Sequence, residues 1–301
     1  MSMIVGIGAN VFDTLITVPS FPKEDTKLRS DGIKLCGGGP CATGLVAAAK
    51  LGAECAYIGC LADDAGGEFL AEDFRRYGVL TEYIDVCGGC GSFSSYILIN
   101  EQNASRTCVF NKGTVPPLKL DEKKRAAVAA ADILMVDGNE LDAAVEAAKL
   151  ARENGVTVLY DAGGLYDGVE RLLPYADVLI PSEEFAEGHT GEKSPEAAAK
   201  RLFEMYYPKT VVITCGKDGG IIYENGRLRR YPAFEVKAVD TNGAGDVFHG
   251  AFAFGLTKGF DYYKCCVFAS AVSAIKCTNT GARQSIPDYK TVTEFLNEHK
   301  K

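Results

Sequence analysis

The chain has 301 residues, 47% of them apolar and 24% charged, which describes a folded globular protein rather than a disordered or membrane-embedded one. Its 32 basic and 40 acidic residues give a formal charge of −8, which argues against a general nucleic-acid binder, whose surface must be basic. The three histidines argue against a histidine-rich metal site or a histidine-based triad, whereas a metal held by carboxylates stays open.

Short apolar runs alternate with longer helical patterns along most of the chain. The predicted strands are residues 4–8, 56–59, 133–136, 156–160, 178–180 and 211–214. The predicted helices are residues 41–51, 139–153, 195–205, 244–257, 262–277 and 289–299. This alternation predicts an α/β fold with a mainly parallel sheet covered by helices on both faces. No repeat or linker interrupts it, so residues 1–301 are expected to form one domain.

Two segments, residues 12–35 and 92–110, break this rhythm. They carry strand-like, partly alternating patterns with no helix between the strands. We expect antiparallel pieces set apart from the main sheet. A small β lid and an ordinary edge hairpin both fit the pattern.

The eleven cysteines lie mostly in apolar runs, where cysteine serves as a small hydrophobic residue. Cys87 and Cys90 have CxxC spacing, but no helix start or second pair accompanies them, so we interpret the motif as a turn with incidental thiols. The first residues are typical of a strand rather than a signal peptide, and no apolar run of about 18 residues occurs. A reducing cytoplasm, without membrane contact, is the expected location.

The strongest chemical signal is the run VDTNGAGDVFHG at positions 239–250. Its small residues lead into a predicted helix, whose first amides and positive dipole end bind anions, particularly a phosphoryl group in transit. Asp246 stands at the mouth of this anion hole, where a carboxylate would repel a resting phosphate. We interpret it as a base that takes a proton from an attacking hydroxyl; the alternative is a carboxylate that only stabilises the helix dipole.

Two further glycine clusters lie beside predicted elements. The run CGGGPCATG at positions 36–44 precedes a helix, where its glycines let the backbone approach a ligand; a tight turn fits equally. The run TCGKDGG at positions 214–220 follows a buried strand, at the sheet edge where ligands bind in open α/β folds. The run GIGANV at positions 6–11 lacks the third glycine of a dinucleotide fingerprint, and no P-loop motif occurs.

Together these clusters resemble the ribokinase-like (PfkB) family of carbohydrate kinases over essentially the whole chain. The run DTNGAGD at positions 240–246 is similar to the family's DTxGAGD signature, Gly38-Gly39 to its first signature, and TxGxxG at positions 214–219 to its nucleotide loop. The resemblance implies a ribokinase-like three-layer α/β/α fold with a mainly parallel central sheet, a small β-strand lid formed by residues 12–35 and 92–110, and transfer of the ATP γ-phosphoryl group to a sugar hydroxyl.

The resemblance also implies roles for individual residues. Asp246 is the expected general base, and the amides of Gly243, Ala244 and Gly245 are expected to stabilise the transferred group. The expected sugar contacts are Asn10, Asp13, Gly38, Gly39, Thr43 and, from the lid, Arg106, for which a solvated surface arginine is the alternative. The expected nucleotide contacts are Thr214, Gly216, Gly219 and Asn279. His249 is then a residue of the anion-hole helix and not a catalyst.

Cations and partners follow from the same resemblance. The family's magnesium-linked NxxE motif falls at Ser182 to Phe185, where neither signature residue is present. Mg²⁺ is therefore left to Glu183, Glu184 or the nucleotide phosphates and water. Some relatives are activated by K⁺ near the anion hole, which makes Asp240, Asn242 and Ser285 candidate ligands. The lid of the family can also form a homodimer interface.

The leading hypothesis is a Mg²⁺-dependent, ATP-using kinase of a ketose or related sugar. The run GGGPxAT at positions 37–43, with IKCT at 275–278 and GAR at 281–283, resembles the sulfofructose- and ketohexose-kinase side of the family. Thr43 stands where ribokinases usually have asparagine, which argues against ribose, and the absence of an arginine from residues 136–141 argues against a sulfosugar. The alternatives are a nucleoside kinase of the same superfamily and a non-catalytic sugar- or nucleotide-binding protein on this fold. A dinucleotide oxidoreductase is less favoured still.

Overall fold

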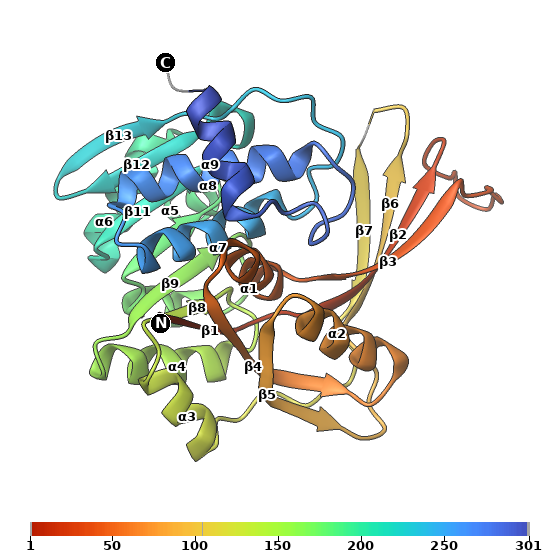
Figure 1. Cartoon of the computed structure of the whole chain (residues 1–301), viewed down its shortest axis with the longest axis horizontal. Coiled ribbons are helices and arrows are strands. Elements are labelled where there is room, and N and C mark those ends of the chain that lie inside the picture. Colours follow the sequence, from red (N-terminus) through yellow and green to blue (C-terminus); the bar gives the residue numbers. More distant parts are fainter. Residues whose placement is uncertain (1, 104, 300–301) are drawn as a thin grey trace.

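The computed structural model describes residues 2–103 and 105–299. Within them, a large sheet contains, in spatial order, β13 (Arg227–Tyr231), β12 (Gly220–Glu224), β11 (Thr210–Thr214), β10 (Val178–Pro181), β9 (Thr157–Ala162), β8 (Ile133–Val136), β1 (Met3–Ile7), β4 (Glu54–Ala62) and β5 (Val79–Cys87) (Figure 1). Its neighbouring strands are parallel except at one edge, where β12 pairs antiparallel with β11 and with β13. The prediction of a mainly parallel sheet is confirmed.

Helices cover both faces of this sheet. One layer contains α1 (Pro40–Leu51), α2 (Ala65–Arg76), α7 (Ala244–Thr257), α8 (Tyr262–Cys277) and α9 (Tyr289–Glu298), and the other contains α3 (Glu122–Ala129), α4 (Leu141–Glu153), α5 (Glu183–Thr190) and α6 (Pro195–Tyr206). Strand side chains alternate between the two layers: Ile4 packs with the first core cluster and Val5 with the second. The predicted three-layer α/β/α fold is therefore confirmed.

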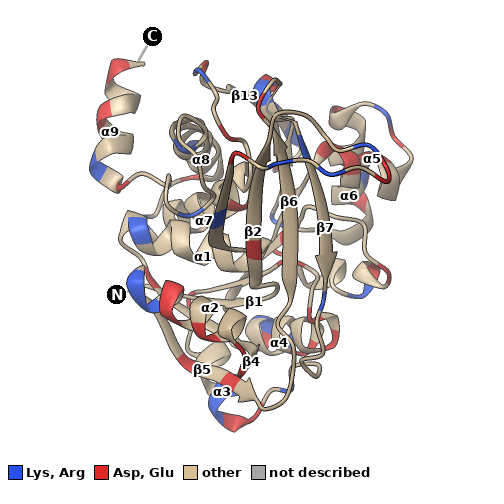
Figure 2. Ribbon diagram, turned by 90° about the vertical axis from the view of Figure 1, so that its right-hand side faces the viewer, with Lys and Arg blue, Asp and Glu red and all other residues tan. Residues whose placement is uncertain are grey.

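The two irregular segments form a separate sheet with the order β3 (Gly32–Gly38), β2 (Val11–Val18), β6 (Ser94–Asn100) and β7 (Arg106–Asn111). This lid sheet lies beside the main body in Figure 1 and is seen face-on in Figure 2. Its two hairpins are antiparallel, as expected, but β2 and β6 join them in parallel. Residues far apart in sequence thereby form one surface over the ends of the main strands.

The described helices include none with the length and hydropathy that a bilayer crossing requires. All eleven cysteines are free thiols, and Cys87 ends β5 instead of opening a helix. Burial raises the pKa of Cys36 to about 12, which keeps that thiol protonated and unreactive.

The helices α1 and α7 approach each other through glycines. A Cβ atom at Gly250 in α7 would overlap the Gly44 carbonyl oxygen in α1, and a Cβ at Gly44 would lie 2.6 Å from the methyl carbon of Met135. Only hydrogen fits between the two helices at this point. The close approach places the N-terminus of α1, next to the Gly38-Gly39 turn, beside the N-terminus of α7, next to Asp246.

This contact predicts opposite effects for two glycine substitutions in α7. Gly250→Ala should lower the free energy of unfolding by about 2 kcal/mol or more, because its methyl group meets backbone that cannot rotate away. Gly245→Ala is the matched control. It should raise the free energy of unfolding slightly, because its methyl group would meet no atom within 4 Å and alanine favours helix over glycine. Urea denaturation measures both, and an equally stable Gly250→Ala protein would contradict the close contact.

Candidate active site

The start of α7 forms the predicted anion hole. Gly243 is its N-cap with a φ of 74°, a left-handed conformation that favours glycine, and no side chain caps the helix. The amide of Ala244 donates to the Thr241 carbonyl at 3.2 Å. The amides of Gly243 and Gly245 are therefore the better anion donors of the predicted three, at the positive end of the helix dipole.

Asp246 lies in the first turn of α7, partly buried between opposing charges. Burial raises the pKa of its carboxyl group, and the neighbouring carboxylates of Asp137 and Asp13 raise it further, whereas His249 and Arg106 lower it. A carboxylate whose pKa is raised from its ordinary value accepts a proton more readily than a solvated one. The arrangement suits the predicted base.

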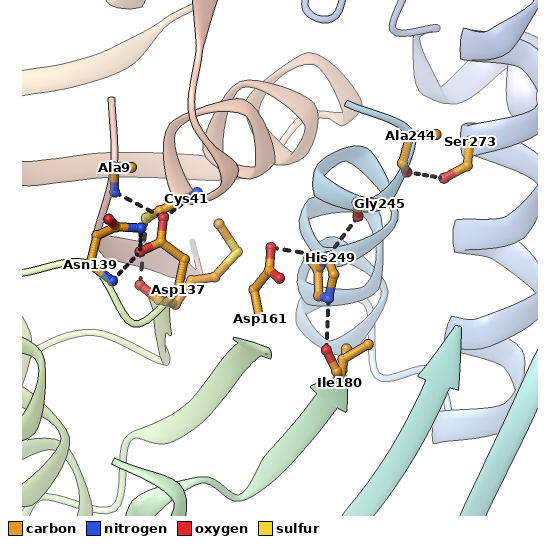
Figure 3. Close-up of polar contacts among 11 residues, drawn as sticks. Ala9, Cys41, Asp137, Asn139, Asp161, Ile180, Ala244, Gly245, His249 and Ser273 are labelled. Carbon is orange, nitrogen blue, oxygen red and sulfur yellow. Dashed lines mark hydrogen bonds and ion pairs between the residues drawn. The ribbon is translucent and has the colours of Figure 1, made fainter. Parts of the chain in front are cut away.

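His249, one turn further along α7, connects the anion hole to the sheet (Figure 3). Its Nδ1 atom lies 2.6 Å from the Gly245 carbonyl oxygen and 3.1 Å from the Asp161 carboxylate, and its Nε2 atom lies 3.0 Å from the Ile180 carbonyl oxygen. Burial raises the pKa of Asp161, and the nearby Asp246 carboxylate adds to the effect. His249 thus fixes the first turn of α7 against the ends of β9 and β10.

Asp137 is a second buried carboxylate that our sequence prediction did not select. It follows β8 and accepts hydrogen bonds from the amides of Ala9 (2.8 Å), Cys41 (3.0 Å) and Asn139 (2.9 Å), as Figure 3 shows. It therefore joins the loop after β1 to the first turn of α1. The signal in the sequence was an acidic residue directly after a buried apolar strand.

Asp13, on β2 of the lid sheet, faces the same space from the opposite side. Ser95 on β6 donates its hydroxyl hydrogen to the Asp13 carboxylate at 2.6 Å. Burial raises the pKa of Asp13 to about 6, although the Ser95 hydrogen bond and the Arg283 charge lower it. A Cβ at position 38 would overlap this carboxylate, which explains glycine there.

Arg283 ties the predicted sugar contacts together from behind. Its fully buried guanidinium donates to the carboxylate of Asp73 on α2 (2.7 Å) and to the side-chain oxygen of Asn10 (2.9 Å). It also donates to the carbonyl oxygen of Gly38 (2.6 Å) and to the hydroxyl oxygen of Thr43 (3.4 Å). Thr43 is itself fully buried, so it supports the site from behind rather than lining it. The buried amide nitrogen of Asn10 has no protein partner, which leaves a donor for a ligand.

The lid reaches the anion hole through Arg106 on β7. Its guanidinium donates to the Thr241 hydroxyl at 3.2 Å, in the loop that leads into α7. The lid arginine therefore lies beside the loop that leads to the predicted anion hole, while its side chain remains exposed, so both of the predicted alternatives for Arg106 stay open.

The predicted nucleotide loop joins β11 to β12. Thr214 ends β11, Gly216 and Gly219 have positive φ values of 56° and 78°, and a side chain at Gly219 would overlap the Tyr231 carbonyl. Asn279 is exposed after α8 and donates its side-chain amide to Thr278 at 3.1 Å. The loop and Asn279 present polar backbone and side-chain groups at the same end of the sheet as α7.

The region expected to serve magnesium forms a helix start. Ser182 caps α5 by accepting from the Phe185 amide at 3.1 Å, and Phe185 is in the core. Glu183 and Glu184 are exposed in the first turn. Burial raises the pKa of Cys215 in the predicted nucleotide loop, and the nearby charge of Glu183 raises it further. The described residues contain no cluster of three acidic, histidine or cysteine side chains suited to a metal. Glu183 fits a water-mediated contact to nucleotide-bound Mg²⁺ better than direct ligation.

The three candidate K⁺ ligands are already bonded within the chain. The Asp240 carboxylate accepts from the amides of Asn242 (2.8 Å) and Gly281 (2.7 Å), and the Ser285 hydroxyl donates to the Gly281 carbonyl. The ammonium group of Lys276 stands beside them and donates to the Asp240 carbonyl oxygen at 2.8 Å. A buried ammonium group therefore stands beside the Asp240 oxygen atoms that were predicted to bind K⁺.

Comparison with known proteins identifies the family of the chain. The pfkB family of carbohydrate kinases matches residues 1–289. A ribokinase of Haemophilus influenzae is 31% identical over 300 residues, covering 97% of each chain. A 5-dehydro-2-deoxygluconokinase of Clostridium perfringens is 28% identical over 289 residues, covering 89% of this chain and 85% of the relative.

Solved structures are similar along nearly the whole chain. A ribokinase from Thermotoga maritima has a TM-score of 0.85 at 26% identity, covering 98% of this chain and 99% of the other. The ribokinase of Arabidopsis thaliana, complexed with ribose and ATP, has a TM-score of 0.87 at 24% identity and covers 98% of each chain. These relatives are sugar kinases, but none of the four is a sulfofructose or ketohexose kinase.

The electrostatics of the site predict opposite stability effects for two Asp→Asn substitutions. With a folded pKa of about 6 against an ordinary value of 3.8, ionised Asp13 destabilises the fold at pH 7.5 by up to about 3 kcal/mol. Asp13→Asn should therefore raise the free energy of unfolding at pH 7.5. The gain should shrink at pH 5, because folded Asp13 takes up its proton as the pH falls through 6.

Asp73→Asn is the matched comparison. It removes the carboxylate that pairs with buried Arg283 and should destabilise the protein by about 3 kcal/mol or more. Urea denaturation at the two pH values measures both substitutions. A destabilised Asp13→Asn protein at pH 7.5 would show that the Asp13 carboxylate is not strained by burial.

Proposed function

The chain belongs to the pfkB family of carbohydrate kinases, and on this basis we propose that it transfers the γ-phosphoryl group of ATP to a sugar hydroxyl, with Asp246 as the general base. The observation that carries the proposal is Asp246 at the uncapped start of α7, with Asp13 facing it from the lid. The family and the relatives named above place the enzyme among phosphotransferases with an alcohol acceptor.

In the proposed reaction, the acceptor oxygen forms a bond to the γ-phosphorus while the bond from that phosphorus to the β–γ bridging oxygen breaks. The hydroxyl proton passes to the Asp246 carboxylate, and ADP leaves. The amides of Gly243 and Gly245 stabilise charge on the transferred group, and Arg106 adds a positive charge from the lid. Asp13 and the free amide hydrogens of Asn10 orient the sugar hydroxyls.

The nucleotide is proposed to bind at Thr214, Gly216, Gly219 and Asn279. Bound Mg²⁺ would neutralise charge on the nucleotide phosphates, with Glu183 holding one of its waters.

The free cysteines support a reducing cytoplasm as the place of action.

For the acceptor, we propose a ketose or a related sugar. A cavity of about 440 Å³ adjoins Asn10 and is lined further by Asn139, Lys112 and Phe93. Asp13 and Asp246 are not part of its lining, so it would receive the part of the acceptor that extends beyond Asn10. The same cavity suits the base of a nucleoside, so a nucleoside kinase is the second candidate. The relatives named above give less support to the sulfofructose side of the family than to pentose and sugar-acid kinases.

The lid also supports a proposed homodimer. Leu35, Tyr96 and Val109 are in register on one face of the lid sheet, with exposed fractions of 48%, 55% and 64%. Charged residues are sparse on these strands in Figure 2. A second copy of the same sheet would cover this apolar face.

A coupled ADP-release screen of ketoses, ribose, deoxyribose, sugar acids and purine nucleosides tests the function. We expect turnover with a sugar, and turnover with nucleosides alone would favour the second candidate. ATP binding without turnover on any acceptor would identify a non-catalytic binding protein.

With an accepted sugar, Asp246→Asn should reduce kcat by about 10³-fold and leave ATP binding intact, because only the proton acceptor is lost. Asp13→Asn should act mainly on KM. Steady-state kinetics separate these effects. An Asp246→Asn enzyme with near-normal kcat would rule out Asp246 as the base.

A further inference from the structure

Lys276 is a buried cation that the reaction described above does not use. It lies in the last turn of α8, its side chain is fully buried, and its Nζ atom lies 2.8 Å from the Asp240 carbonyl oxygen and 4.0 Å from the Asp240 carboxylate. A buried ammonium group is costly unless nearby oxygens compensate its charge. The oxygen atoms of Asp240, where the loop before α7 begins, provide this compensation for Lys276.

This loop leads directly into the anion hole. Asp240 stands three residues before Gly243, the N-cap of α7, and its carboxylate holds the amides of Asn242 and Gly281. Arg106 contacts the next residue, Thr241, from the lid. Two fixed cations thus support the backbone that presents the anion-binding amides.

A metal cation at the same place would be opposed by the ammonium group. At about 4 Å, two unit charges repel each other by several kcal/mol under the effective dielectric constant of a protein site. The oxygen atoms of Asp240 already accept three hydrogen bonds from Asn242, Gly281 and Lys276. The ammonium group of Lys276 therefore already supplies the positive charge that a bound cation would bring to this loop.

We propose that the ammonium group of Lys276 takes the place of a monovalent cation at the loop before α7, so that phosphoryl transfer by this enzyme needs no K⁺. The catalytic part of this inference, that the reaction needs no K⁺, rests on the kinase function proposed above. Its structural part, a cation site filled by a side chain, stands on the contacts of Lys276 alone.

The first test compares the wild-type enzyme in KCl and in tetramethylammonium chloride at equal ionic strength. Tetramethylammonium is too large to enter such a site. Equal rates and equal melting temperatures in the two salts are expected. Stimulation or stabilisation of the wild-type protein by K⁺ would overturn the proposal.

The second test uses Lys276→Ala, which removes the charge and opens space. Its rate in tetramethylammonium chloride should fall roughly tenfold or more, and K⁺ or NH₄⁺ should restore much of it. Its melting temperature should rise with K⁺ concentration, as for any ligand that binds the folded state. A variant that responds to K⁺ no more than the wild type does would contradict the proposal.

Lys50→Ala is the matched control. Lys50 also donates to carbonyl oxygens of the segment after α8, those of Arg283 (3.3 Å) and Gln284 (3.2 Å), but does not contact Asp240. It should gain no response to K⁺. The melting comparisons need no sugar, so they decide the cation proposal even if the acceptor screen finds no substrate and the kinase proposal fails.

Discussion

The buried guanidinium of Arg283 is the interaction on which the sugar side of the site depends. A fully desolvated arginine must have its donors satisfied, and here they are satisfied by α2, the loop after β1, the end of β3 and α1. Gly38 and Thr43 flank the single turn between β3 and α1, whereas Asn10, this turn, α2 and Arg283 itself come from separate parts of the sequence. Because Arg283 holds the side-chain oxygen of Asn10, the amide nitrogen of Asn10 is left without a protein partner and is available to the proposed sugar. The requirement to compensate one charge thus determines where the sugar contacts stand.

The phosphoryl side depends on a different balance. Three buried or partly buried carboxylates, those of Asp137, Asp161 and Asp246, converge at the strand ends beside α7. Backbone amides compensate Asp137, and His249 lies against Asp161. Burial raises the pKa of Asp246, which suits the role of general base proposed for it. The net charge of −8 does not predict these local charges, because helix ends and single side chains create them.

Periodic apolar segments with clear caps were predictable, and charged core residues were not. The bounds of α7 and α8 agree with the sequence prediction, since an apolar run follows a glycine loop in one case and the capping residue Asp261 in the other. The helix α2 was missed because it opens with glycines, of which Gly67 must lie against the Ala62 carbonyl. The β12–β13 hairpin carried a recognisable signal, Asn225-Gly226, with both residues at positive φ. Lys276 and Arg283 could not be placed inside from sequence, because lysine and arginine are almost always solvated.

The glycine contact between α1 and α7 also bears on how such an enzyme changes its acceptor. Where two helices meet through backbone atoms, there is no side chain to enlarge, trim or re-angle, so the two binding turns stay in one fixed relation through sequence drift. The outer lid strands β3 and β7 carry no such restriction, because most of their side chains are exposed. If the lid holds the acceptor as proposed, a library built to alter acceptor preference belongs on β3 and β7, where side chains can be exchanged while α1 and α7 stay in place.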